Sequence, residues 1–178
     1  MDRKKLIENL IDLDEEAYLL FSGEERVPAQ RFKVIVVGSS SLIIKELIIR
    51  ATNDTDILEA PAQLMPLLEK YHMNTRVVAY LDSFSYNFED RLELLPIAGR
   101  IIDYYSPSLE DLLISKLYRN EKYDLEDYKS ILASTSLNWE LLERLVYDEN
   151  EARASMMIPR HYEDMVYAYR AFKEEYFK

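Results

Sequence analysis

One short run of the sequence constrains the fold more than any other: Val34-Ile35-Val36-Val37, which ends at Gly38. Four β-branched residues bounded by a glycine are typical of a buried strand that ends in a sharp turn. Gly38 and Ser39 then form the turn, and a glycine lets the backbone approach a ligand because it has no Cβ. The following residues open a helix, whose free N–H groups suit an anion such as phosphate. The run therefore predicts a strand followed by a phosphate-binding turn.

Two aspartates lie downstream of this turn. Between them and the turn, apolar residues at helical spacing predict one amphipathic helix packed on the strand: Ile43, Ile44, Leu47 and Ile48. If residues 55–58 form a second strand, Asp54 and Asp56 point to the same face, since strand side chains alternate with a period of two. Two carboxylates at that separation can hold a hard cation such as Mg²⁺.

The remaining periodicity is mainly helical. Helices are predicted at residues 4–21 (ended by Gly23), 62–71 (with an internal Pro66, which is tolerated only in a first turn), 107–119, from Asp124 onward, 138–147 and 161–177. Strands are predicted at 33–37, 55–58 and 100–105, whereas 76–81 is too brief to tell a strand from a short helix. These elements predict an α+β fold with a small mixed sheet flanked by helices. Residues 1–105 would form the α/β core and 106–178 a helical C-terminal part of one compact unit.

Composition limits the possible metal chemistry and location. The chain has no cysteine and two histidines, His72 and His161, far apart in the sequence. A zinc site is therefore not expected, and a metal must be held by oxygen or histidine. No stretch reaches the roughly 18 apolar residues of a membrane span, and the first residues lack the apolar segment of a signal peptide. We expect a cytoplasmic protein with no membrane partner.

The net charge of −11 repels nucleic acid on average, so an RNA substrate would require a local basic surface. The candidates for such a surface are Arg50, Arg100, Lys116, Arg119, Lys122 and Lys129. The alternative is that these are solvated charges on helix surfaces, an interpretation that we favour for Lys122 and Lys129.

A second group of polar residues lies in the C-terminal half. Ser106 as N-cap and Pro107 at the first helical position predict the start of a helix. Lys116 lies beside the apolar stripe of this helix, where a lysine can bury its stem and direct its ammonium group into a cleft or to solvent.

Two aspartates begin the helix that follows. Asp124 is well placed as a cap at the helix start. Asp127 lies one turn further on, where a carboxylate has no capping use. We therefore expect Asp127 to serve a site or to form a salt bridge with Lys116 or Arg119.

Together these patterns resemble a known family. The first block is similar to the motif of the nucleotidyltransferase superfamily (polymerase-β-like), and its matching residues are Gly38, Ser39, Arg50, Thr52, Asp54 and Asp56. The second block resembles the later signature of the AbiEii-type abortive-infection toxins within that superfamily, with one more residue between proline and aspartate. Its matching residues are Ser106, Pro107, Asp111, Leu112, Lys116, Leu117, Arg119, Asp124, Leu125 and Asp127.

The resemblance implies a mechanism. Asp54 and Asp56 would hold one or two Mg²⁺ ions that bridge the triphosphate of an NTP. Lys116 would place a charge on the phosphates or the leaving pyrophosphate, and Asp127, with Asp124, would orient Lys116 or activate the acceptor. The residues expected to bind the nucleotide are Gly38, Ser39, Arg50, Thr52, Lys116, Arg119 and Asp124. Superfamily members often carry a third carboxylate on a later strand, for which Glu93 and Asp103 are the candidates.

In the family that the chain resembles, the acceptor is the 3′ end of tRNA, and transfer there blocks translation. The resemblance thus implies a toxin of a toxin–antitoxin or phage-defence system, with a cognate antitoxin as partner. Two alternatives stay open. The chain could transfer a nucleotide to a protein or small molecule, or it could be a nucleotide-binding or interaction module without catalysis.

Overall fold

The computed structural model describes residues 1–22, 31–148, 150–152 and 158–176. The chain divides into two compact units. The first, unit 1, contains Met1–Val78 and Leu92–Ser106, and the second, unit 2, contains Ala79–Arg91 and Pro107–Lys178. The segment between residues 79 and 91 thus belongs to unit 2, although it interrupts unit 1 in the sequence.

Unit 1 is built on a mixed sheet, as the sequence predicts, and this sheet has four strands rather than the three expected. Its strands are β1 (Phe32–Val37), β2 (Asp56–Glu59), β3 (Glu93–Leu94) and β4 (Ile102–Ser106), in the order β2-β1-β4-β3. β1 is parallel to β4, whereas β2 and β3 are antiparallel to their neighbours. Because β1 is central, the four residues 34–37 are all buried, which explains their unbroken apolar sequence.

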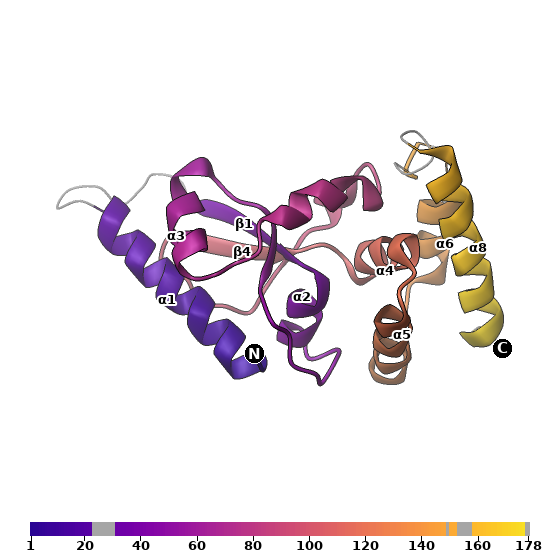
Figure 1. The fold of residues 1–178 in the computed structure, drawn as a ribbon, viewed down its shortest axis with the longest axis horizontal. Coiled ribbons are helices and arrows are strands. Elements are labelled where there is room, and N and C mark those ends of the chain that lie inside the picture. Colours follow the sequence, from indigo (N-terminus) through magenta and orange to yellow (C-terminus); the bar gives the residue numbers. More distant parts are fainter. Residues whose placement is uncertain (23–30, 149, 153–157, 177–178) are drawn as a thin grey trace. The chain divides into compact units, whose positions relative to one another are not determined.

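Helices surround this sheet: α1 (Arg3–Phe21), α2 (Gly38–Ile44) and α3 (Met65–Lys70), the last preceded by a 3₁₀ turn, η1 (Ala62–Leu64). Figure 1 shows β1 and β4 side by side, with the three helices around them. Pro66 lies in the first turn of α3, where a proline is tolerated, because the α-helix begins at Met65 and not at residue 62 as predicted. The predicted end of the first helix, Gly23, lies outside the described residues, and α1 is followed by Ser22.

A buried carboxylate joins α1 to the sheet. Asp14 is 1% exposed. Its oxygens accept hydrogen bonds from the backbone N–H groups of Arg100, Ile101 (3.0 Å) and Ile102 (2.7 Å). Asp14 thus satisfies three donors where the chain enters β4, and it fixes the start of that strand against the helix.

The helix after the Gly38 turn is shorter than predicted. α2 ends at Ile44, and Glu46 adopts a left-handed conformation with φ of 62°. The N–H groups of Glu46 and Leu47 then donate to the carbonyls of Ile43 (3.1 Å) and Leu42 (2.9 Å), the pattern of a Schellman cap. The prediction that Leu47 and Ile48 continue the helix is therefore wrong, because the cap turns the chain before them.

The segment after α3 contains two short 3₁₀ helices, η2 (Arg76–Ser83) and η3 (Phe88–Arg91). The strand interpretation of residues 76–81 is thus excluded. The second predicted strand is confirmed one residue later than expected, at Asp56–Glu59. The third is confirmed as β4, whereas the two-residue β3 was not recognised in the sequence.

Unit 2 is helical, with α4 (Leu109–Arg119), α5 (Lys122–Ser134), α6 (Trp139–Tyr147) and α8 (Pro159–Tyr176). The prediction that Ser106 caps α4 is wrong, because Ser106 ends β4 and its Oγ shares a hydrogen bond of 2.5 Å with Ser41 Oγ. Ser108 is the cap instead, and its Oγ accepts from the N–H of Asp111 at 3.1 Å. The helix therefore begins two residues later than predicted.

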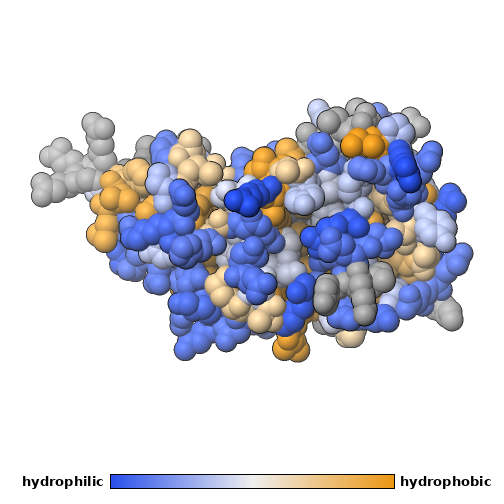
Figure 2. Space-filling view, in the orientation of Figure 1, coloured by the Kyte–Doolittle hydropathy of each residue, from blue (hydrophilic) through white to orange (hydrophobic). Residues whose placement is uncertain are grey.

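The surface carries scattered apolar side chains. The face in Figure 2 is largely hydrophilic, with hydrophobic residues in separate spots. Among the most exposed apolar residues are Leu19, Ile49 and Tyr167. In the part of the chain that the structure describes, no helix combines the length and the apolar character needed to cross a membrane.

Candidate functional site

The turn after β1 brings a glycine backbone against a carboxylate. Gly38 has a φ of 64°, which side chains rarely adopt. A Cβ at this position would lie 2.5 Å from Asp56 Oδ2. Asp56 reaches this point because it opens β2 and pairs with Val37, the last residue of β1. Glycine is therefore required here for two reasons: the backbone conformation and the space taken by the Asp56 carboxylate.

An arginine lies on the same turn. The guanidinium Nη2 of Arg50 donates to Ser39 Oγ at 2.6 Å. The segment after α2 thus folds back and places a positive charge beside the turn residues. Thr52 lies further along this segment, where its Oγ1 donates to the carbonyl of Asp54 at 3.2 Å. The structure therefore brings Arg50 to Ser39 and uses Thr52 to shape the backbone before β2.

Two polar side chains form hydrogen bonds with Asp56. Its backbone N–H donates to Ser40 Oγ at 3.2 Å, and Ser40 Oγ donates to the carbonyl of Val37 at 2.8 Å. Asn74 Nδ2 donates to Asp56 Oδ1 at 2.8 Å. Sequence reasoning missed both Ser40 and Asn74. Ser40 follows the Gly-Ser pair directly, but Asn74 lies in a segment with no periodicity to identify it.

Asp54 lies two residues before Asp56, in the bend that leads into β2, and both side chains are half-buried. Within the described residues, no group of three or more acidic or histidine side chains could hold a metal ion. The predicted metal donors are therefore the two carboxylates of Asp54 and Asp56 alone. Mg²⁺ is commonly bound by one or two carboxylates together with substrate phosphates and water, so these residues fit that ion.

The two candidates for a third carboxylate lie at opposite ends of the sheet. Asp103 is paired with Lys33 in the strand register, near the start of β1, and its Oδ1 accepts from Arg31 Nε at 2.8 Å. Glu93 is paired with Ser106, at the end of β4, and its Oε2 accepts from Lys45 Nζ at 2.7 Å. Parallel strands end at the same edge, so Glu93 and the Gly38 turn share an edge of the sheet, whereas Asp103 does not lie there.

A buried ionic cluster occupies unit 2. Lys116 is 3% exposed, and its Nζ donates to Asp124 Oδ1 at 2.7 Å and to Asp127 Oδ2 at 2.8 Å. Arg119 is half-exposed and donates to both oxygens of Asp124, from Nε at 2.9 Å and from Nη2 at 2.7 Å. The salt bridge that the sequence suggested between Asp127 and Lys116 is therefore present.

Asp124 has a different role from the predicted cap. Glu121 occupies the N-cap position of α5, and the Asp124 carboxylate binds Lys116 and Arg119 instead. Burial alone would raise the pKa of Asp124, but hydrogen bonds and charge from Arg119 and Lys116 outweigh it and hold the pKa below its usual value. The carboxylate therefore stays ionised, and the cluster holds two anions around the buried ammonium group.

Tyr128 lies beside this cluster on α5. It is fully buried, and its ring packs edge-on against Phe172 of α8, with ring centroids 5.3 Å apart. Burial raises its pKa well above the usual range, and the nearby charge of Asp124 raises it further. Among the described residues its hydroxyl has no hydrogen-bond partner. Nothing in the sequence distinguished this tyrosine from the other apolar positions of α5.

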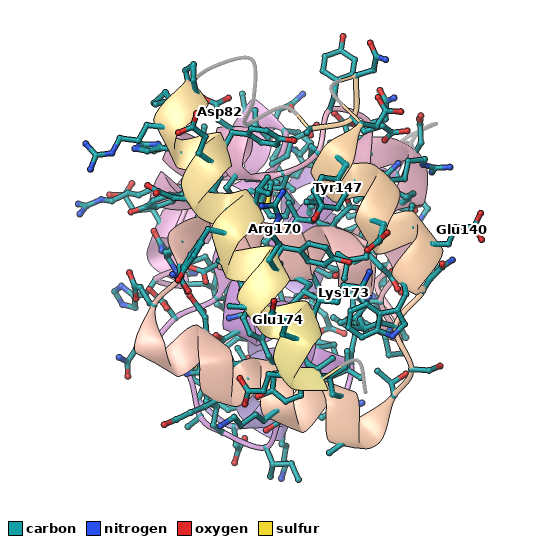
Figure 3. The ribbon with its side chains drawn as sticks, turned by 90° about the vertical axis from the view of Figure 1, so that its right-hand side faces the viewer. Asp82, Glu140, Tyr147, Arg170, Lys173 and Glu174 are labelled. Carbon is teal, nitrogen blue, oxygen red and sulfur yellow. The ribbon has the colours of Figure 1, made fainter. Side chains whose placement is uncertain are left out.

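Two further predicted basic residues, Arg100 and Lys129, have acidic partners, whereas the side chain of Lys122 lies outside the described part of the chain. Arg100 Nη2 lies 3.8 Å from Glu15, and Lys129 Nζ lies 3.9 Å from Glu175. On α8, Lys173 binds Glu143 of α6. Figure 3 shows α6 and α8 beside each other, with Arg170, Lys173 and Glu174 along α8. Basic and acidic side chains thus alternate in this part of unit 2.

The sequence-predicted residues therefore fall into two groups. Unit 1 contains Gly38, Ser39, Arg50, Thr52, Asp54 and Asp56. Unit 2 contains Lys116, Arg119, Asp124 and Asp127. Within each unit, residues 11 positions apart in the sequence are brought into direct contact, as in the pairs Arg50 with Ser39 and Lys116 with Asp127.

Comparison with known proteins gives one match. The model of a family described as "Nucleotidyltransferase of unknown function (DUF6036)" matches residues 8–177. No curated protein and no solved structure matches the chain. The family match covers both the Gly38 turn and the Lys116 cluster.

Proposed function

The chain belongs to a family of nucleotidyltransferases, and on that premise we propose that it transfers a nucleotide from an NTP to the 3′ end of tRNA, with Mg²⁺. The main support for the proposal is the close approach of the Asp56 carboxylate to Gly38. Because Gly38 has no Cβ, the Asp56 carboxylate lies close to the turn and a phosphate can approach the backbone there.

Asp54 and Asp56 would hold the metal, which supplies positive charge to the triphosphate and so favours attack at the α-phosphorus. The turn residues would contact the phosphate groups of the NTP. The bare backbone of Gly38 lets a phosphate approach closely, and Arg50, held on Ser39, adds a guanidinium group that binds phosphate oxygens. These contacts position the β- and γ-phosphates.

The reaction breaks one bond and forms one. The acceptor oxygen attacks the α-phosphorus, the bond from the α-phosphorus to the bridging oxygen breaks, and pyrophosphate leaves. The proton of the acceptor hydroxyl passes to a base or to water. We assign Lys116 to the phosphates or the pyrophosphate, and we assign Asp124 and Asp127 to the orientation of Lys116, in accord with their direct bonds to Nζ.

A tRNA acceptor would make the protein a toxin of the AbiEii-type branch, acting in the cytoplasm within a toxin–antitoxin or phage-defence system and bound by a cognate antitoxin. The supporting feature is the spacing of the second block, in which Lys116 precedes Asp124 and Asp127. In the structure Lys116 forms ion pairs with Asp124 and Asp127, so the three residues of this block lie together.

The charge of the chain favours a second candidate, transfer to a protein or small molecule. The net charge is −11, and the basic side chains Arg100, Lys129 and Lys173 each have an acidic partner. Binding to RNA depends on lysine and arginine that can neutralise phosphates. A protein or small-molecule acceptor does not need such a surface.

Incubation of the protein with Mg²⁺ and each of four NTPs labelled at the α-phosphate, in the presence of total RNA and a protein lysate, tests these proposals. We expect label in the tRNA fraction. Label in protein alone would replace the tRNA acceptor with the second candidate. Absence of label from both pools, together with a melting temperature raised by Mg²⁺ and NTP, would indicate a nucleotide-binding module without transfer.

A matched control shows whether the label depends on the metal ligands. The double variant Asp54→Ala, Asp56→Ala should transfer no label. The double variant Asp12→Ala, Asp164→Ala removes the same charge from two exposed helix positions and should transfer as much as the wild type. Equal transfer by both double variants would contradict the assigned metal site.

A further inference from the structure

The side chain of Asn74 is held from several directions next to Asp56. Its backbone N–H donates to Thr55 at 2.8 Å, and its carbonyl accepts from Ile57 at 2.9 Å, so the residue forms a bridge with the start of β2. Its side chain then bonds to two further groups, the N–H of Arg76 and the carboxylate of Asp56. These bonds fix both the backbone and the amide group of Asn74.

The hydrogen bonds also decide which way the amide points. The N–H of Arg76 can only donate, and it lies 3.1 Å from Asn74 Oδ1, which must accept. The amide nitrogen therefore points to Asp56, and Nδ2 donates to Oδ1 at 2.8 Å. A reversed amide would place two donors together at Arg76 and two acceptors together at Asp56. The orientation thus follows from chemistry rather than from shape.

The other oxygen of Asp56 lies against the Gly38 turn. Oδ2 is 2.5 Å from the place that a Cβ of residue 38 would occupy, and the backbone N–H of Asp56 donates to Ser40 Oγ. The Asp56 carboxylate therefore has one oxygen bound by an amide donor and the other at the turn. A carboxylate fixed in this way does not have to lose rotational freedom when it binds a cation.

We propose that Asn74 is a positioning residue that binds Asp56 Oδ1 and thereby presents Oδ2 to the divalent metal at the Gly38 turn. The inference rests on the proposed function, because it assumes that Asp56 is a metal ligand. It adds a residue outside both sequence blocks, and it explains why a neutral donor occupies this place. An acidic residue there would add a charge beside Asp56 and compete for the cation.

The test is direct binding of Mn²⁺ in the absence of NTP and of turnover. Binding is measured as the decrease of the free Mn²⁺ signal in electron paramagnetic resonance. Asn74→Ala should bind Mn²⁺ about tenfold more weakly than the wild type, in line with the loss of a residue that orients a metal ligand. Asn53→Ala removes the same group from an exposed position near Asp54 and should bind as the wild type does. Equal affinity in Asn74→Ala and the wild type would overturn the inference.

A second variant keeps the test decisive if Asn74→Ala fails to fold. Asn74→Asp retains the size of the side chain and an acceptor for Arg76, but it places two carboxylates side by side. We expect its melting temperature to fall in metal-free buffer and to rise with Mn²⁺ by more than that of the wild type, because the cation offsets the repulsion. A rise no larger than in the wild type would show that the metal does not bind beside residue 74.

The wild type and Asp56→Ala separate this inference from the proposed function. If the wild type binds Mn²⁺ and Asp56→Ala does not, the metal site stands, and the Asn74 variants alone decide the role of Asn74. If the wild type and Asp56→Ala bind Mn²⁺ equally, the metal site itself is wrong, and the role assigned to Asn74 falls with it.

Discussion

Position 38 has no room for one additional carbon atom. In Gly38→Ala, a left-handed backbone would cost about 1–2 kcal/mol, and the new Cβ would lie 2.5 Å from Asp56 Oδ2. The carboxylate must move, so we expect label transfer to fall at least tenfold at a temperature where the variant is folded. Transfer from an α-labelled NTP, with the folded fraction measured by circular dichroism, provides the measurement.

Gly99→Ala is the matched control. Its Cβ would meet the carbonyl of Ile102 at 2.3 Å and Asp14 Oδ1 at 2.9 Å, so this variant should also lose stability. It does not disturb Asp56. If both variants lose activity in proportion to their folded fractions, then Gly38 acts only on stability, and its assigned place in the site is wrong.

Asp124 gives a prediction for the effect of pH. Its pKa is lowered in the folded protein, so the unfolded state binds more protons and stability rises with pH. The ionised Asp124 carboxylate adds its full stability to the folded protein above the unfolded pKa of about 3.9. This added stability is lost as the pH falls through the lower pKa of the folded state. Asp124→Asn should therefore cost about 2–3 kcal/mol at pH 7 and progressively less below pH 4.

Urea denaturation across the pH range measures this difference. Glu126→Gln changes an exposed carboxylate on the same helix and should leave the free energy of unfolding nearly unchanged at every pH. A cost for Asp124→Asn that stays constant down to pH 2 would show that the ionised carboxylate does not supply the stability.

At the scale of residues, the sequence identified side chains with a distinct local pattern and missed those defined only by their neighbours. Gly38 and Asp56 stood out because a glycine ends an apolar run and a carboxylate opens the next strand. Asn74 and Tyr128 did not, since their importance comes from contacts across the fold. Asp124 was predicted as a cap because it lies near a helix start, but a lysine and an arginine from α4 bind it instead.

At the scale of elements, one buried ion pair joins the segment between residues 79 and 91 to α4. Arg91 donates to both oxygens of Asp111, at 2.8 Å and 3.0 Å, and Asp111 is completely buried. Hydrogen bonding to Asp111 also raises the pKa of Arg91. Ser85 and Ser108 donate to the same carboxylate. The aspartate of the second block thus has a structural function: it holds this segment within unit 2.

Arg91→Ala should destabilise the protein by about 3–5 kcal/mol, because it leaves a buried carboxylate without its positive partner. Lys129→Ala removes an exposed ion pair with Glu175 at 3.9 Å and should cost less than about 1 kcal/mol. Urea denaturation of both variants at pH 7 measures the difference. Equal costs would mean that the Arg91 pair adds no more stability than a surface contact.

Helix and strand positions were largely predictable, but their ends were not. The apolar periodicity of α1, α6 and α8 was clear, and the structure confirms these helices. α2 ends early because Glu46 takes a left-handed conformation, which a glutamate does not signal. α4 begins at Leu109 because Ser108, not Ser106, caps it. Ser106 is held at the end of β4 instead, where its Oγ shares a hydrogen bond with Ser41 Oγ.

At the scale of the whole molecule, the nucleotidyltransferase family followed from the resemblance of the first block, and the α+β fold followed from the spacing of the apolar residues. The acidic net charge could be counted from the sequence, but the sequence did not predict which basic side chains pair with acidic ones. It also did not predict that the segment between residues 79 and 91 belongs to unit 2. This segment belongs to unit 2 through Arg91 and Asp111, residues on either side of the two strands β3 and β4.

The central claim is that Asp54 and Asp56 support transfer of the α-phosphate of an NTP to an acceptor. The most direct measurement compares one NTP labelled at the α-phosphate with the same NTP labelled at the γ-phosphate, each with Mg²⁺ and total RNA. We expect the α-label to enter the acceptor and the γ-label to appear in pyrophosphate. The double variant Asp54→Ala, Asp56→Ala should abolish both the labelling of the acceptor and the release of labelled pyrophosphate. Transfer of the γ-label to the acceptor, or α-label transfer that persists in the double variant, would contradict the central claim.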